Sequence, residues 1–318
     1  MNLKDTMKFF ELITNFDNLY LAMQRAYKTE SSNQGVKFRI NWIHNLLELK
    51  EKLKKDIWIP NEYKYFTIYK PKERLISKAQ FEDRIVHHSY INAIKDYYLS
   101  QFSPNSYASL PNKGVHRARG KVFEYRQKYN YFLKTDIKHY FENINHKILI
   151  DILKRNITEE KLNNLEYRII DNTLNKEKGL PIGNLTSQFW ANIYLNELDK
   201  FIVANNLEFV RYMDDTIIFS DDRDRLKRFL KDMKVFLRDN LKLELKDSAT
   251  LLNSNNNLPF CGVSFSKTEY HLRKENKKRY IKEYNPKIQK YYFGKTPEYI
   301  FQSQQSCNKS IFNKLVIV

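Results

Sequence analysis

The chain has 318 residues, of which 42% are hydrophobic and 29% are charged, a composition that excludes a largely disordered protein. Its length allows two or three packed subdomains around a sizeable core. The 55 Lys and Arg residues against 37 Asp and Glu residues give a formal net charge of +18. This charge favours a polyanionic partner such as nucleic acid, and a general abundance of Asn, Ile and Lys is the alternative explanation.

The cysteine content and the N-terminal sequence bear on the compartment. Cys261 and Cys307 are too few for a disulfide framework or a cysteine-based zinc site. The N-terminus lacks the apolar core and the small-residue cleavage site of a signal peptide. No segment has the unbroken apolar length of a membrane helix. We therefore expect a soluble protein in a reduced, cytoplasmic interior, with no membrane partner.

The N-terminal part is predicted to be helical with one hairpin. Apolar residues recur at helical spacing through residues 1–58. The stretch YKYFTIYKPKERLIS (63–77) alternates and carries Pro71 among basic residues, which indicates a β-hairpin with a cationic tip. AQFEDRIVHHSYINAIKDYYLSQF then returns to a helical pattern. His87 and His88 are adjacent in it and so point in different directions on a helix, which makes them a poor chelating pair; we interpret them as structural.

Strands and helices alternate in the C-terminal part. YNYFLKTDI (129–137) is predicted to be a strand, residues 145–175 are predicted to be helical, and KGLPIGN (178–184) leads into the helix LTSQFWANIYLNELDKFIVAN. EFVRYMDDTIIFSDD (208–222) is typical of a hairpin, RDRLKRFLKDMKVFLRDNL of an amphipathic helix, and LPFCGVSFS (258–266) of one short strand before a basic tail. A few strands among many helices predict an α+β fold, with a small antiparallel sheet backed by helices.

Two acidic residues interrupt the apolar run of the 208–222 hairpin. Asp214 and Asp215 stand where the hairpin would turn, and a turn dipeptide is one explanation because Asp favours turns. Asp136, however, also ends an apolar and aromatic strand. If the two strands are neighbours in one sheet, three carboxylates meet at one end of it and raise their own pKa values unless cations neutralise them. Such oxygen ligands suit Mg²⁺, and two ions about 4 Å apart would hold both reacting oxygens of a phosphoryl transfer.

The motifs around these carboxylates resemble those of the reverse transcriptase family, in the family's order. YKPKERLISKAQFEDRIVHHSYINAI is similar to the fingers motifs, FLKTDIKHYFENINH to the first palm motif, and GLPIGNLTSQFWANIYLNELDKFI to the second. FVRYMDD is similar to the catalytic hairpin, LKLELKDSAT to the motif after it, and FCGVSFS to the strand that grips the primer. Six ordered motifs over roughly 200 residues make coincidence a poor explanation.

The resemblance implies an α+β right-hand polymerase with fingers, palm and a short helical thumb. Residues 1–130 would form an N-terminal helical extension and fingers, residues 131–265 the palm, with part of the fingers at about 147–178, and residues 266–318 a basic helical thumb. Residues 267–318 hold 12 Lys and Arg against 4 Asp and Glu, which suits a helix along the phosphates of a primer–template. No RNase H or endonuclease motif follows the palm, so we expect other enzymes to remove the template strand.

The resemblance also implies roles for individual residues. Asp136 and Asp214 would be the main ligands of two Mg²⁺ ions, with Mn²⁺ as a substitute, and Asp215 would be the supporting carboxylate. Phe141 would crowd a ribose 2′-OH and so favour deoxynucleotides, whereas a core aromatic is the alternative reading of the same residue. The residues expected at the incoming nucleotide are Lys70, Lys72, Arg74, Phe141, Gln188 and Lys246. The other motif positions are Pro181, Ile182, Gly183, Tyr212 and Met213, with Phe260, Cys261 and Gly262 as the primer grip.

Two of these assignments have a specific chemical basis. By the resemblance, Arg74 would belong to the basic hairpin that closes on the triphosphate. A guanidinium suits that task because it forks onto phosphate oxygens; a solvated charged loop is the alternative. Lys246 is a candidate proton donor to pyrophosphate. The expected partners are an RNA template, a DNA primer and product, and dNTPs, together with a noncoding RNA or an accessory protein. The oligomeric state is not indicated.

The second palm motif distinguishes lineages within the family. Many reverse transcriptases carry Pro-Gln-Gly followed by Ser-Pro, whereas this chain has Pro181-Ile182-Gly183 and then Ser187-Gln188. IGNLTSQ resembles diversity-generating retroelement reverse transcriptases, which copy a template RNA with errors at adenines. Bacterial antiviral reverse transcriptases, which often work with a noncoding RNA, carry overlapping variants. Ile182 would remove a hydrogen-bonding contact near the nascent pair, or simply pack against the helix that follows.

Two further functional classes remain open. One is a basic RNA-binding scaffold with an inactive polymerase fold, against which the retention of three costly aspartates argues. The other is a DNA-templated or template-independent nucleotidyltransferase.

Overall fold

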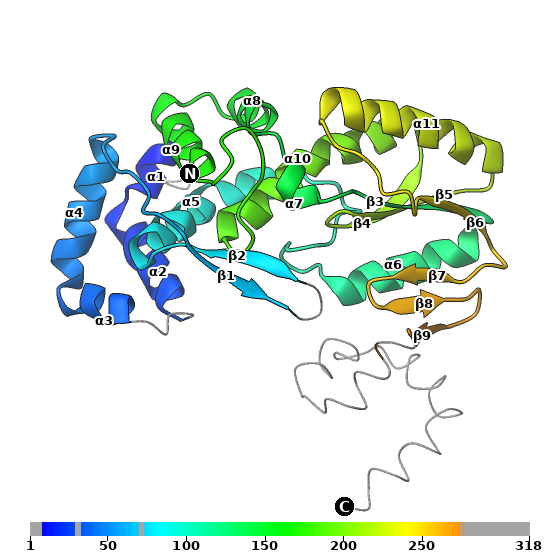
Figure 1. Ribbon diagram of the computed structural model, residues 1–318, viewed down its shortest axis with the longest axis horizontal. Helices are drawn as coiled ribbons and strands as arrows, with labels where there is room; N and C mark the ends of the chain where they lie inside the picture. The colour runs from blue at the N-terminus through cyan, green and yellow to red at the C-terminus, as the bar shows by residue number, and fades with distance from the viewer. Residues whose placement is uncertain (1–7, 29–32, 70–72, 274–275, 277–318) are drawn as a thin grey trace, which may run out of the picture. The chain divides into compact units, whose positions relative to one another are not determined.

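The computed structural model describes residues 8–28, 33–69, 73–273 and 276 (Figure 1). The chain divides into two compact units, and the chain passes between them several times. The first unit comprises Met1–Ser103, Ile137–Phe201 and Met233–Leu245, and the second comprises Pro104–Asp136, Ile202–Asp232 and Lys246–Val318.

The first unit is mainly helical. Its helices are α1 (Phe9–Ile13), α2 (Phe16–Tyr27), α3 (Asn33–Ile40), α4 (Trp42–Lys54), α5 (Phe81–Leu99), α7 (Tyr140–Asn143), α8 (His146–Asn156) and α9 (Glu160–Asp171). Helices α10 (Leu185–Ala204) and α11 (Arg223–Asn240) contribute residues to both units. The helices predicted within residues 1–58, 145–175 and 223–241 are confirmed.

Helix α5 is the centre of the first unit. The Asn18 side chain of α2 donates to the Ser89 carbonyl oxygen over 3.0 Å. The rings of Tyr90 and of Trp190 of α10 meet edge to face, with centroids 5.7 Å apart. Both of these large side chains are buried, so α5 contacts α2 and α10 within the core of the unit.

A two-stranded hairpin completes the first unit. β1 (Lys64–Ile68) and β2 (Arg74–Lys78) are antiparallel, with Ile68 opposite Arg74. The predicted hairpin is therefore confirmed. Its tip, with Lys70, Pro71 and Lys72, lies outside the described residues.

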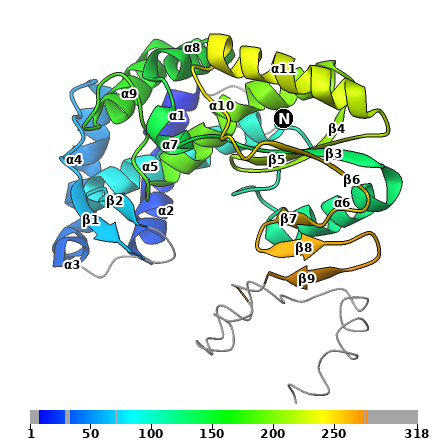
Figure 2. The same cartoon turned by 45° about the vertical axis from the view of Figure 1, so that its right-hand side comes forward.

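The second unit is built on a four-stranded antiparallel sheet. Its strands are β3 (Tyr131–Asp136), β4 (Glu208–Tyr212), β5 (Asp215–Ser220) and β6 (Thr250–Asn253), in the order β4-β5-β3-β6. Helix α6 (Val115–Lys128) lies between this sheet and a smaller one formed by β7 (Leu258–Phe260), β8 (Val263–Phe265) and β9 (Tyr270–Leu272) in both views (Figures 1 and 2). Side chains from α6 and both sheets share one apolar core, which includes Val122, Phe132, Phe219, Phe260 and Phe265.

One predicted strand is wrong. LPFCGVSFS is two strands rather than one, because Cys261 and Gly262 have φ of 45° and 84°. This left-handed backbone reverses the chain between β7 and β8. Helix α6 and strand β6 had no counterpart among the predicted elements. Strand β9 lies at the start of the range predicted to be a helical thumb, most of which is outside the described residues.

None of the helices in the described part of the chain combines the length and the apolar character that crossing a membrane requires.

Candidate active site

The β4–β5 hairpin carries the paired acidic residues at its turn, as predicted. Tyr212 and Asp215 close the ladder opposite each other, so Met213 and Asp214 form the turn. Met213 has φ of 55°, which is uncommon for a residue with a side chain. The guanidinium of Arg211 donates from Nη1 to the Met213 carbonyl oxygen over 3.1 Å. The Met213–Asp214 turn is therefore a strained turn held by a neighbouring side chain.

Strand β3 brings the third predicted carboxylate to this turn. Asp136 is the last residue of β3 and pairs with Asp215 of β5. Residues that face each other across an antiparallel pair project from the same side of the sheet. The structure therefore gathers Asp136, Asp214 and Asp215 at one end of the four-stranded sheet.

Two lysines adjoin these carboxylates. Lys246 Nζ lies 2.8 Å from Asp136 Oδ1, and the Lys246 amide donates to the Asp136 carbonyl oxygen over 2.8 Å. Lys134 Nζ lies 4.0 Å from Asp215 Oδ1. Lys246 was predicted to belong to the site, whereas Lys134 was missed. The period of two along a strand, which puts Lys134 on the same face as Asp136, could have identified it.

Burial raises the pKa values of the two hairpin carboxyls. It raises the pKa of Asp215 to about 7; Lys134 opposes this shift, while Asp136 and Asp214 add to it. The pKa of Asp214 is raised first by burial and second by the negative charge of Asp136. Their ionised forms are costly unless positive charge lies nearby.

The donor chemistry of this cluster fits a divalent cation. Oδ1 of Asp136 and Oδ1 of Asp215 are buried and accept no hydrogen bond of suitable geometry, although Lys246 Nζ is close to the former. In the described ranges no group of three or more His, Cys, Asp or Glu side chains is arranged to hold a metal ion, so the aspartates do not form a preassembled cage. Mg²⁺ is commonly held by one or two carboxylates with substrate phosphates and water, which these residues can accommodate.

The residues predicted at the nucleotide lie in the first unit, apart from Lys246. Arg74 begins β2 and is exposed, and Gln188 is exposed near the start of α10. Phe141 is half-buried in α7, and its carbonyl oxygen accepts from the Leu180 amide over 2.8 Å. Lys70 and Lys72 lie outside the described residues. The contacts of these side chains with a nucleotide stay predictions.

Gln188 also lines an open cavity of about 420 Å³. The other lining residues are Phe66, Ile76, Ser77, Lys78, Ala79, Arg84, His87, His88, Gly183, Asn184 and Leu185. Burial is the main reason why the pKa of His87 falls to about 3 and that of His88 to about 4. Both imidazoles are therefore neutral at neutral pH.

The second palm motif docks against β2. The Ser77 amide donates to the Ile182 carbonyl oxygen over 2.8 Å. Gly183 follows with φ of 116°, and a Cβ at this position would lie 2.9 Å from Ile76 Cγ2 and 3.3 Å from the Ser77 carbonyl oxygen. Only glycine fits this close approach without a shift of the backbone. Pro181 and Ile182 are half-buried.

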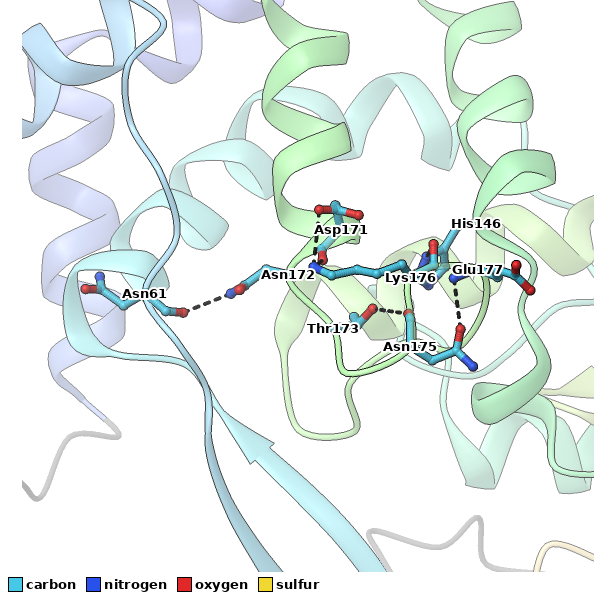
Figure 3. Close-up of polar contacts among 8 residues, drawn as sticks. All are labelled: Asn61, His146, Asp171, Asn172, Thr173, Asn175, Lys176 and Glu177. Carbon is cyan, nitrogen blue, oxygen red and sulfur yellow. Dashed lines mark hydrogen bonds and ion pairs between the residues drawn. The ribbon is translucent and has the colours of Figure 1, made fainter.

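The loop that leads into this motif is held by side chains on both sides (Figure 3). The ring nitrogens of His146 lie 3.0 Å from the Lys176 carbonyl oxygen and 2.6 Å from that of Gly179. Asn172 Nδ2 donates to the Asn61 carbonyl oxygen over 2.8 Å. The segment before Pro181 is thus tied to α8 and to the chain that enters β1.

The predicted primer grip is the β7–β8 turn. Phe260 is buried, and Cys261 and Gly262 make the reversal. Arg119 of α6 donates from Nε to the Cys261 carbonyl oxygen over 3.1 Å, and its Nη2 also bonds this oxygen. Burial raises the pKa of the Cys261 thiol, which favours the unreactive thiol form. Arg119 also opposes the burial-driven rise in the pKa of Tyr212, so its charge acts on both the β7–β8 turn and the β4–β5 hairpin.

Sequence reasoning missed Arg119 and Arg211. A single arginine within the apolar stretch FVRYM was the available signal for Arg211, because a buried charge requires a specific partner. Arg119 stands among several basic residues in VHRARGK, so nothing in its local sequence distinguishes it.

Solved structures share this fold. Apo telomerase from Candida Tropicalis superposes with a TM-score of 0.51 and 13% identity, over 69% of this chain and 49% of that one. Telomerase from Candida albicans, in complex with a fragment of telomeric RNA, gives a TM-score of 0.50 and 12% identity, over 69% and 48%. The predicted α+β polymerase fold with small antiparallel sheets is confirmed.

Sequence comparison then defines the family. The family described as reverse transcriptase (RNA-dependent DNA polymerase) matches residues 53–265, which is more than half of the chain. The chain belongs to this family.

Curated relatives agree with this assignment. Group II intron-encoded protein LtrA of Lactococcus lactis is 24% identical over 264 residues, covering 77% of this chain and 42% of the relative. The Saccharomyces cerevisiae protein named "Putative COX1/OXI3 intron 2 protein" is 24% identical over 266 residues, covering 63% of this chain and 31% of the relative. The chain therefore spans less than half the length of these two relatives.

Proposed function

We propose that the chain is an RNA-directed DNA polymerase that extends a DNA primer on an RNA template with dNTPs. One observation carries the proposal: Asp136, Asp214 and Asp215 meet at one end of the four-stranded sheet, in a chain of the reverse transcriptase family. A half-buried group of carboxylates opposes folding, so its presence is most simply explained by a need for cations.

The proposed chemistry is nucleotidyl transfer. Two divalent ions, Mg²⁺ or Mn²⁺, would supply the positive charge that activates the primer 3′-OH and stabilises the departing pyrophosphate. Asp136 and Asp214 would hold them, and Asp215 would support the site. Lys246, 2.8 Å from Asp136, is suited to neutralise charge and to give a proton to pyrophosphate. Positioning and charge neutralisation are the main tasks of a protein in this chemistry.

The substrate contacts follow the family resemblance. Phe141 would exclude the ribose 2′-OH, and Arg74, with Lys70 and Lys72, would bind the triphosphate. The β7–β8 turn would hold the primer, and residues 266–318 would act as the thumb on the primer–template. Fingers, palm and thumb are our names for these proposed roles.

Primer extension tests the proposal. A labelled DNA primer on an RNA template is incubated with dNTPs and Mg²⁺, and the wild type is compared with Asp214→Asn. We expect Asp214→Asn to lower the rate about 1000-fold, because it removes several kcal/mol of transition-state stabilisation. The control is Asp224→Asn, an exposed aspartate of α11 paired with Lys227. No product from the wild type, or equal product from Asp214→Asn, overturns the proposal.

The same assay separates the alternatives. Extension with a DNA template, or without any template, in preference to RNA favours a different nucleotidyltransferase. RNA binding without any extension favours an inactive scaffold.

We further propose a diversity-generating retroelement as the biological setting, supported by the resemblance of Ile182–Gln188 and of the fingers motifs to that lineage. An antiviral role with a noncoding RNA is the second candidate, because SYASLPNKGVHRARGKVFEY and the C-terminal tail match the diversifying lineage less closely. Sequencing the cDNA made in cells distinguishes them. Adenine-directed errors in copies of a template repeat support diversification, whereas cDNA copied from a noncoding RNA of a phage-defence locus supports immunity.

A further inference from the structure

Three arginines of the second unit are buried and donate to backbone carbonyls at turns. Arg211, Arg119 and Arg126 are each at most 1% exposed. Arg126 Nη2 donates to the carbonyl oxygens of Ser254 and Asn256, over 3.3 Å and 2.9 Å, in the turn between β6 and β7. A buried guanidinium is tolerated where hydrogen bonds replace its hydration. All three residues therefore bond carbonyl oxygens of turns, each in a different turn, although Nε and Nη1 of Arg126 are buried without a hydrogen-bond partner.

The backbone of Arg211 is fixed on both sides of β4. Its amide donates to the Asn105 carbonyl oxygen over 2.9 Å, and its carbonyl oxygen accepts from the Tyr107 amide over 2.9 Å. On the other side it pairs with Thr216 of β5. The guanidinium is therefore extended from an anchored position rather than from a loop.

From this position Arg211 reaches the catalytic turn. Its Nη1 bonds the carbonyl oxygen of Met213, the turn residue with φ of 55°. The next residue is Asp214. A strained backbone conformation persists only where its surroundings determine it strongly, and fixing this carbonyl fixes the peptide plane that joins Met213 to Asp214.

We propose that Arg211 is a positioning residue of the active site. Its guanidinium holds the Met213 carbonyl and thereby sets the direction in which the Asp214 carboxylate leaves the turn, beside Asp136 and Asp215. A lysine would not replace it, because an ammonium lacks the planar fork of donors. The catalytic part of this inference rests on the proposed polymerase function, whereas the structural part does not.

The test compares Arg211→Lys with the matched control Arg126→Lys. Both substitutions remove a buried guanidinium that bonds turn carbonyls. For each protein, kcat and KM for dNTP are measured by primer extension, and amide hydrogen exchange is followed in peptides covering 208–216 and 250–260. We expect Arg211→Lys to lower kcat about 10- to 100-fold through a misplaced carboxylate, to change KM less than about twofold, and to speed exchange in 208–216 only. Arg126→Lys should speed exchange in 250–260 and leave kcat within about twofold of the wild type.

Several results would overturn this inference. The first is a kcat of Arg211→Lys equal to that of the wild type. The second is a wild-type rate of amide exchange in its 208–216 peptide. The third is the same loss of kcat in Arg211→Lys and Arg126→Lys. If the wild-type protein extends no primer, the polymerase proposal fails, and the exchange measurement alone decides whether Arg211 fixes the turn.

A second background covers the case in which Arg211→Lys does not fold. Met213→Gly removes the backbone strain of the turn, since glycine accepts positive φ. In the Met213→Gly background, Arg211→Lys should fold and still lower kcat relative to Met213→Gly alone. An equal kcat in the two proteins would show that Arg211 acts only by relieving strain and would defeat the positioning role.

Discussion

Asp136 and Asp215 are paired residues on neighbouring antiparallel strands, so two acidic side chains face each other across one step of the β3–β5 ladder. Like charges placed directly opposite in a sheet are destabilising. The sheet nevertheless carries this pair at the end where the β4–β5 hairpin adds Asp214. A site of this kind exchanges stability for function, and the two quantities can be measured separately.

Asp215→Asn is expected to make the protein more stable and less active. At pH 8 the Asp215 carboxyl, whose pKa is raised to about 7, is ionised although half-buried. The amide removes this charge, and we expect the free energy of unfolding to rise by roughly 1–3 kcal/mol. Urea denaturation and primer extension at pH 8 test both effects, with Asp224→Asn as the surface control. A less stable Asp215→Asn protein would refute this explanation of the cluster.

Arg119→Lys is expected to weaken the binding of primer–template. Arg119 donates two hydrogen bonds to the Cys261 carbonyl oxygen in the predicted primer grip. Loss of a hydrogen bond from a charged donor should raise the Kd about tenfold, as measured by fluorescence anisotropy of a labelled DNA primer annealed to RNA. Arg126→Lys is the control. The same increase in Kd for both variants would remove the specific role of Arg119.

Phe141→Ala is expected to relax the exclusion of ribonucleotides. The proposed gate is the aromatic ring, while the backbone bond from Leu180 to Phe141 does not depend on the side chain. The ratio of kcat/KM for dNTP to that for rNTP should fall at least about tenfold. Tyr140→Phe, which changes the neighbouring aromatic residue of α7, should leave the ratio unchanged. An unaltered ratio in Phe141→Ala would count against the gate.

Gly183→Ala is expected to destabilise the first unit, whereas Gly120→Ala should stabilise the protein. Alanine at position 183 places Cβ 2.9 Å from Ile76 Cγ2 and keeps a strained φ of 116°, at an expected cost of about 1–3 kcal/mol. Gly120 lies within α6 with nothing inside 4 Å of an added Cβ, so alanine should contribute roughly 0.5–1 kcal/mol. Urea denaturation measures the free energy of unfolding of both variants. Equal changes in this free energy for Gly183→Ala and Gly120→Ala would contradict the close approach of Gly183 to β2.

The stability of the protein should depend on pH through Glu166 of α9. Glu166 is buried and accepts from the Tyr90 hydroxyl over 2.6 Å. Burial raises its pKa from 4.5 to about 7, so between these values the folded chain holds a proton that the unfolded chain has lost. This contribution to the free energy of unfolding is complete below about pH 4.5, declines as pH rises and is lost above about pH 7. The total loss is up to about 3 kcal/mol.

The test compares the wild type with Glu166→Gln. The free energy of unfolding, measured at pH 5 and at pH 8, should fall less with pH in Glu166→Gln because the amide does not titrate. Parallel pH profiles for the two proteins would show that Glu166 does not titrate in this range.

Local patterns predicted most elements, and distant contacts account for the errors. The β4–β5 hairpin and the strand that ends at Asp136 were visible because alternation and turn residues are encoded within a few positions. The register that pairs Asp136 with Asp215 joins distant parts of the chain. From the sequence we could therefore predict only that the carboxylates meet if their two strands are neighbours in one sheet. The β7–β8 turn was missed because Cys261 seldom adopts positive φ, and Gly262 alone is a weak signal.

The arginines that brace the turns were missed for a related reason. Arg211 and Arg119 donate to the carbonyl oxygens of Met213 and Cys261. Because every residue provides a carbonyl oxygen, these bonds leave no signal in the sequence. Helix α6 was missed because charged residues and Gly120 interrupt its apolar spacing. By contrast, Asp136, Asp214 and Asp215 were predicted together because Asp136 ends a second apolar strand, which a turn dipeptide at Asp214 and Asp215 does not explain.

The segment at residues 105–107 also has a consequence for the behaviour of the protein in solution. β4 is the outer strand of its sheet, and an uncovered outer strand offers free amide and carbonyl groups to strands of other molecules. At Arg211 these groups are already bonded to Asn105 and Tyr107, next to the Met213–Asp214 turn. At this position the chain thus protects its own sheet margin from intermolecular strand addition, beside the turn that carries Asp214.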